Sequence, residues 1–136
     1  MTMTPRSKKP PPLPPPLGEL EAEVMEHVWA SGESSVRAAM DELNARAAEP
    51  RAYTTYMTVL ARLHRKGLLE RRREGKSDHY RPTLSRREYR ERRAGAEVQA
   101  LVDDYGDAVC PQFARQMARL DPERQAELRR LAQEGG

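Results

Sequence analysis

The sequence predicts a mostly α-helical protein with one small β-hairpin: a winged helix-turn-helix followed by a C-terminal helical region. Three observations lead to this fold class. Apolar residues recur at helical spacing in three successive segments between Leu17 and Lys66. A glycine-containing turn then separates two short segments that can pair as a hairpin. Beyond Leu84 the helical spacing returns, but each segment there carries few apolar residues.

The first two helices follow from their apolar stripes and their boundary residues. The first ends at the Ser31-Gly32 turn, and its glutamates lie mostly off a stripe formed by Leu20, Val24, Met25, Val28 and Trp29. Either Ser34 or Ser35 can cap the second helix, which ends near Asn44. The loop that follows contains Pro50, which keeps the preceding residue extended.

The third helix is predicted from about Ala52 to Lys66, with Gly67 as its C-cap. Its buried face consists of residues within an arc of about 100°, namely Tyr56, Val59, Leu60 and Leu63. No acidic residue occurs from Arg51 to Leu69, although one third of the whole chain is charged. The exposed face of this helix is therefore compatible with a polyanion.

The hairpin is predicted around a turn at residues 74–77, with Leu69 and Tyr80 as its anchors. Pro82 indicates that the second strand is short or lies at an edge. After Leu84, the sequence SRRE (85–88) is a capping box that opens a helix to about Asp104. Gly106 ends this helix, and Asp121-Pro122 begins the last one.

The C-terminal helices are too poor in apolar residues to form a monomeric core, so we expect them to bury their stripes in a homodimer. The predicted dimerisation residues are Val98, Leu101, Val102, Tyr105, Val109, Phe113, Met117, Leu128 and Leu131. The expected organisation is a disordered proline-rich tail at 1–16, a winged helix at 17–84 and a dimerisation region at 85–134.

Positive charge is concentrated in the predicted winged helix. Between Arg51 and Arg93 there are 14 Lys or Arg residues against 5 Asp or Glu, whereas the rest of the chain is net acidic. This pattern matches a winged helix-turn-helix bound to DNA. In such a protein the second helix of the motif enters the major groove, and the basic hairpin lies along the phosphate backbone. Threonines can bond phosphates or base edges, and arginines and lysine suit phosphates. The predicted DNA contacts are Arg51, Thr54, Thr55, Thr58, Arg62, Arg65, Arg71, Arg72, Arg73 and Lys76. The alternative is a solvated basic surface.

The sequence gives little support for catalysis, metal binding or membrane insertion. No phosphate-binding glycine loop, HExxH or nucleophile elbow is present, so no catalysis and no cofactor are expected. One cysteine, Cys110, excludes an internal disulfide, and three isolated histidines lack ligand spacing, so no metal is expected. Without a signal peptide or an apolar run approaching about 18 residues, the chain is expected to be cytoplasmic.

Three stretches resemble the penicillinase repressor family, also called BlaI/MecI/CopY: LGELEAEVMEHVW (17–29), AYTTYMTVLARLHRKGLL (52–69) and DHYRPTLSRREY (78–89). The likeness covers about residues 17–134. It implies a bacterial homodimeric repressor that binds a double-stranded operator with inverted-repeat symmetry. It also implies that the recognition-helix contacts fall on Thr54, Thr55, Met57, Thr58 and Arg62, where some relatives have a basic residue in place of Met57.

The resemblance also suggests how repression could be relieved. Many members are cut in the dimerisation region when a membrane-bound sensor protease is triggered, and the familiar site is an Asn-Phe bond. The nearest counterpart here joins Gln112 to Phe113, and the single Cys110 does not match the cysteine-rich motif of the copper-responsive branch. Two other functions stay open: a small-molecule-sensing winged-helix regulator, and a protein-interaction adaptor that no longer reads DNA.

Overall fold

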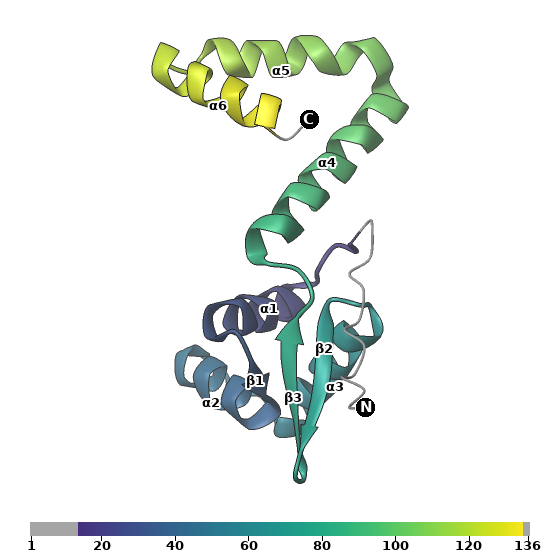
Figure 1. The fold of residues 1–136 in the computed structure, drawn as a ribbon, viewed down its shortest axis with the longest axis vertical. Coiled ribbons are helices and arrows are strands. Elements are labelled where there is room, and N and C mark those ends of the chain that lie inside the picture. The colour runs from purple at the N-terminus through teal and green to yellow at the C-terminus, as the bar shows by residue number, and fades with distance from the viewer. Residues whose placement is uncertain (1–13, 135–136) are drawn as a thin grey trace, which may run out of the picture. The chain divides into compact units, whose positions relative to one another are not determined.

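The computed structural model describes residues 14–134, and contacts divide the chain into two compact units after Gly95. The first contains three helices and a small sheet, which confirms the predicted winged helix-turn-helix (Figure 1). Its elements before the division are α1 (Glu19–Ser31), β1 (Ser34–Ser35), α2 (Val36–Arg46), α3 (Tyr53–Arg65), β2 (Leu69–Glu74) and β3 (Ser77–Pro82).

The sheet has three antiparallel strands in the order β1-β3-β2. Strands β2 and β3 form the predicted hairpin, and its turn contains Gly75 at a φ of 61°, which favours glycine. Strand β1 was not predicted, because two residues carry no periodicity. Its pairing with β3 makes β3 the central strand. Of the two alternatives that Pro82 indicated, a short strand or an edge position, the edge position was therefore wrong. Pro82 is the last residue of β3, beyond the paired stretch of β1, so its missing N–H interrupts no pairing there.

A single apolar core lies between α1, α2, α3 and the hairpin. The four residues predicted for the buried face of α3 are all in it, which confirms that prediction. Full burial of a leucine side chain contributes about 1.5–3 kcal/mol, so this face anchors α3 firmly. The other core residues are Val24, Met25, Val28, Val36, Ala39, Leu43, Leu68, Leu69, Tyr80, Leu84 and Tyr89.

The turn between α2 and α3 is built around the Asn44 side chain. Asn44 Oδ1 accepts from the Arg51 N–H at 2.9 Å and from the Tyr56 hydroxyl at 2.7 Å. Its amide donates to the Arg51 carbonyl oxygen at 2.9 Å. Because Tyr56 is fully buried, its hydroxyl needs such a partner. Asn44 thereby fixes where α3 begins relative to the end of α2.

Helix α4 (Arg86–Tyr105) begins with the predicted capping box. The Ser85 N–H donates to Glu88 Oε1 at 3.1 Å, and the Glu88 N–H donates to Ser85 Oγ at 3.0 Å. The division between the units falls inside α4, after Gly95, whereas the expected domain boundary lay after Leu84. The second unit continues with η1 (Gly106–Ala108), α5 (Val109–Ala118) and α6 (Pro122–Glu134).

Most of the predicted disordered tail, residues 1–13, lies outside the described residues. Residues 14–16 are described, and Pro14 is fully buried in the first unit. Within residues 14–134, none of the helices is long and apolar enough to cross a membrane. The same residues contain no group of three or more His, Cys, Asp or Glu side chains arranged to hold a metal ion.

Candidate nucleic-acid interface

Helix α3 presents a face without carboxylates opposite its buried side. Thr54, Met57, Thr58, Arg62 and Arg65 are exposed, and Thr55 is half-buried at the margin of the same face. The whole helix, YTTYMTVLARLHR, lacks acidic residues, and no side chain caps its N-terminus. The partial positive charge of that terminus is therefore not offset by a carboxylate of α3. This face combines hydroxyl donors, an apolar thioether and two guanidinium groups.

Glu21 and Lys66 form an ion pair that the sequence did not predict. Glu21 is only 7% exposed, and its Oε2 accepts from Lys66 Nζ, just after α3, at 2.7 Å. Its Oε1 accepts from the Gly18 N–H at 2.9 Å. Glu21 stands three residues after the N-cap Gly18, the spacing of a capping box, so the sequence did carry a signal for this role. The pair joins the start of α1 to the end of α3.

Side chains alternate between the two faces of β2, and this alternation separates Arg71, Arg72 and Arg73. Cross-strand partners share a face, and Arg71 and Arg73 pair with Tyr80 and Asp78, on the face of the buried Leu69. Arg72 points to the opposite face, where its partner is His79. Arg71, Arg72 and Arg73 form one run in the sequence, but the structure places them on two sides of the hairpin.

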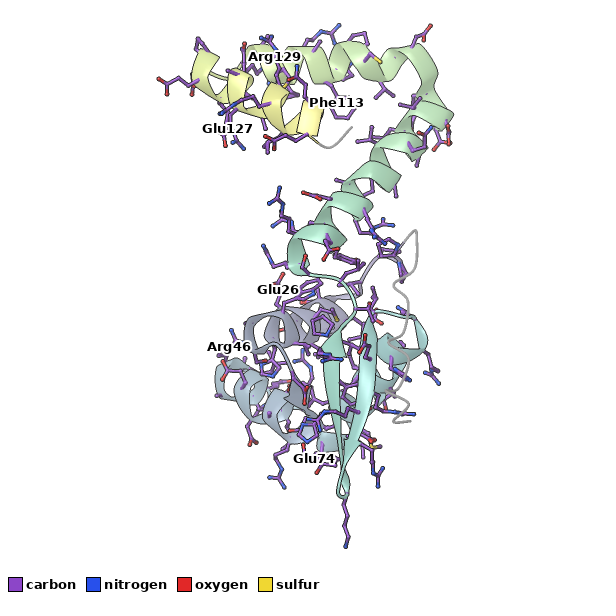
Figure 2. The ribbon with its side chains drawn as sticks, in the orientation of Figure 1. Glu26, Arg46, Glu74, Phe113, Glu127 and Arg129 are labelled. Atoms are coloured by element: carbon purple, nitrogen blue, oxygen red, sulfur yellow. The ribbon has the colours of Figure 1, made fainter. Side chains whose placement is uncertain are left out.

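Arg72 lies in a network of carboxylates on that opposite face. Its guanidinium donates to Glu33, in the loop before β1, and to Glu74 Oε2 at 3.0 Å (Figure 2, Glu74). The bond from Arg72 lowers the pKa of Glu33 below its ordinary value. His79 nitrogens lie 3.6 Å from Glu33 Oε1 and 3.7 Å from Glu74 Oε2. The positive charge of Arg72 is therefore largely compensated within the protein.

The other candidate cations differ in the acids around them. Arg73 lies 3.5 Å from an Asp78 oxygen, and Arg51 lies 3.8 Å from a Glu23 oxygen. Arg71 and Lys76 are exposed and form no ion pair with any residue in 14–134. The structure thus brings Arg71 and Lys76 to the hairpin surface as its least compensated charges.

The second unit has an apolar surface of its own. Val98, Leu101, Val102 and Tyr105 form one stripe of α4, and each is at least 40% exposed. Phe113 and Leu131 are also exposed, Met117 and Leu128 are half-buried, and Val109 is buried within the single chain. An open, mainly apolar groove of about 470 Å³ is lined by Leu101, Tyr105, Ala108, Val109, Gln112, Phe113 and Gln116 (Figure 2, Phe113). Exposed apolar surfaces of this kind mark interaction sites.

Comparison with known proteins identifies a family that this chain matches over most of its length. A family model described as penicillinase repressor matches residues 17–134. The transcriptional regulators BlaI of two Mycobacterium tuberculosis strains, CDC 1551 and H37Rv, are each 42% identical to this chain over 87 residues. That alignment covers 63% of this chain and 59% of each regulator, so the match spans less than two thirds of the curated relatives.

Two solved structures are also similar. One is a solution structure of the DNA-binding domain of the repressor BlaI, with 27% identity, a TM-score of 0.49, and coverage of 57% of this chain and 90% of that one. The other is Bacillus licheniformis BlaI in its monomeric form in complex with the blaP half-operator. It has 28% identity, a TM-score of 0.46, and coverage of 56% and 90%.

We predict that Glu21→Gln removes part of the acid dependence of stability. Burial alone would raise the pKa of the Glu21 carboxyl, but Lys66 and the Gly18 N–H outweigh it and lower the pKa below 4.5. Such a carboxyl stabilises the fold above its unfolded-state pKa, and this stabilisation disappears as the pH falls through the folded-state value. Below about pH 4.5, the free energy of unfolding of the wild type should therefore decrease more steeply than that of Glu21→Gln.

Denaturant titrations at several pH values measure this difference. Glu19→Gln is the matched control, because Glu19 lies in the same helical turn but is exposed and has no ion pair within the described residues. Its pH profile should follow the wild type. Identical profiles for Glu21→Gln and the wild type would contradict the prediction.

Proposed function

The chain belongs to the penicillinase repressor family, and on this premise we propose that it represses transcription by binding operator DNA as a homodimer. A repressor of bacterial genes meets its operator in the cytoplasm, where we place this protein. The family consists of transcriptional repressors and not of enzymes, which confirms the prediction that the chain has no catalytic activity. Residues 17–84 would bind DNA, and residues 85–134 would join two copies.

The acid-free exposed face of α3 carries the DNA-binding part of the proposal. A helix in the major groove passes between two phosphate backbones, where a carboxylate would be repelled. Thr54, Thr55 and Thr58 can bond phosphates or base edges, and Met57 can contact a thymine methyl group. Arg62 and Arg65 can pair with phosphates, or with guanine where the helix angle permits. Asn44 and the Glu21–Lys66 pair hold the two ends of the helix in position.

The apolar stripe of α4 and the groove beside it support the homodimer. A second copy would cover Leu101, Tyr105 and Phe113, which the single chain leaves accessible to water. A two-fold dimer presents two α3 helices and therefore prefers an inverted repeat. The groove also supports a second function, the binding of an apolar small molecule, and a compound that stabilises the protein in a thermal-shift screen would favour it.

We include proteolytic relief in the proposal, through a cut near Gln112-Phe113. This bond lies within helix α5, so α5 must open locally before the bond fits the extended binding site of a protease. A membrane-bound sensor protease would be the partner. Cleavage there would remove α6 and part of the apolar groove from the dimer contact.

Selection of bound duplexes from random DNA tests the proposed function directly. The expected result is a two-fold symmetric motif whose half-sites are spaced for a dimer, with binding that weakens steeply as salt increases. Titration of the recovered sites at two salt concentrations measures this dependence. Recovery of no motif, or binding that vanishes at physiological salt, would leave only a basic surface and favour the interaction-adaptor function.

Adjacent wing arginines should contribute differently to DNA binding. Arg71→Ala removes an uncompensated cation, so the slope of log K against log salt should become shallower by about 0.9 for one lost phosphate contact. Arg72→Ala removes a cation that Glu33 and Glu74 already compensate, so its slope should change less. Fluorescence anisotropy with one operator duplex measures both variants. Equal changes would show that the two faces of the hairpin contact DNA alike.

A charge on the exposed stripe of α4 should disrupt the proposed dimer. Leu101→Asp would bury an unpaired carboxylate in the contact, and we expect the dimer dissociation constant to rise about a hundredfold or more. Ala100→Asp is the matched control, because it introduces the same charge at an exposed residue about 150° around the helix from the centre of the apolar stripe. Sedimentation equilibrium distinguishes the two variants. Dimers of unchanged affinity in Leu101→Asp would place the interface elsewhere.

A further inference from the structure

A proline segment before α1 lies against the first two turns of α4, within the first unit (Figure 1). The Tyr89 hydroxyl donates to the Pro15 carbonyl oxygen at 2.9 Å. Arg93 Nη1 donates to the Pro14 carbonyl oxygen at 3.2 Å. Pro14 itself is less than 2% exposed. Two consecutive carbonyls of the segment thus accept hydrogen bonds from side chains that lie four residues apart on α4, and the Pro14 ring is buried.

Proline chemistry suits this arrangement. Proline has no N–H, so within residues 14–16 the carbonyl oxygens are the only backbone groups that can form hydrogen bonds. Pro14 and Pro15 each precede another proline, which restricts both to extended conformations and leaves little entropy to lose on docking. Proteins that bind proline-rich peptides use the same features, an aromatic surface and side-chain donors to the exposed carbonyls.

Contacts with α1 hold Tyr89 and the start of α4 in place. The Tyr89 ring packs on Trp29 with their centroids 5.4 Å apart, and Trp29 Nε1 donates to the Leu84 carbonyl oxygen at 2.9 Å. Arg86 Nε bonds both carboxylate oxygens of Glu26 at 2.9 Å, at the start of α4 (Figure 2, Glu26). The docking surface is therefore preorganised rather than formed by a mobile helix end.

We propose that Tyr89 and Arg93, supported by Trp29, form a recognition site for a proline-rich segment, and that its occupant is the Pro14–Leu17 segment of the same chain. The bound segment joins the N-terminal end of α1 to the second turn of α4. The first unit thus includes both the proline segment and the beginning of the helix that leads to the second unit. The proposal is independent of the proposed repressor function.

Hydrogen exchange of the full-length protein tests the docking. Pro14→Gly keeps the carbonyl but loses the buried ring, and Tyr89→Phe loses only the hydroxyl donor. Each should speed exchange of the α4 amides from Tyr89 to Arg93 about five- to tenfold, the scale of one hydrogen bond. Pro16→Gly makes the same chemical change at an exposed residue, so it loses only the restriction on Pro15 and should speed exchange less than Pro14→Gly does. Unchanged exchange in α3 confirms that each variant is folded.

Addition of a peptide in trans separates recognition from simple packing. In the Pro14→Gly/Pro15→Gly double variant, a peptide of residues 9–18 at about millimolar concentration, the effective concentration of a short tether, should restore α4 protection. The same peptide with glycine at 14 and 15 should not. Failure of the proline peptide to restore protection, or equal rates in Pro14→Gly and Pro16→Gly, would overturn the site. Wild-type protection that depends on protein concentration would assign the occupant to a second copy instead.

Discussion

The one-sided burial of α3 is the constraint on which the rest of the first unit depends. Tyr56, Val59, Leu60 and Leu63 are all in the core, so the rotation of the helix about its axis is determined by packing. Every residue proposed to contact DNA from α3 is exposed or half-buried for that reason. Asn44 at one end and the Glu21–Lys66 pair at the other prevent the helix from sliding along the core.

The parts of this fold that were predicted correctly are those encoded by local periodicity. The apolar stripe identified the buried face of α3, and the spacing of Ser85 and Glu88 identified the cap of α4. Gly75 similarly marked the hairpin turn. In each case the interacting residues are close in sequence, so the physical reason for the structure could be read from a short window.

The features that were not predicted depend on distant partners. Strand β1 has two residues and exists because Ser34 and Ser35 pair with residues of β3. The capping-box spacing of Glu21 from Gly18 is visible in the sequence, but its ion pair with Lys66 is not, because the two residues are 45 positions apart. The difference between Arg71 and Arg72 requires the strand register, and compensation of Arg72 requires Glu33 from another element. Composition reports charge, whereas the field at the surface depends on which charges are paired.

The carboxylates around the hairpin also provide a route by which affinity could evolve. Glu33 and Glu74 bond Arg72, and Glu70 bonds Arg81 at 2.8 Å, so each neutralises a cation already present. For a chain that binds DNA as proposed, replacing one of these acids would release positive charge without adding an arginine. Sequence drift at acidic positions that never touch the operator would then strengthen non-specific as well as specific binding. Selection for discrimination between sites would therefore act to retain the acids as well as the bases.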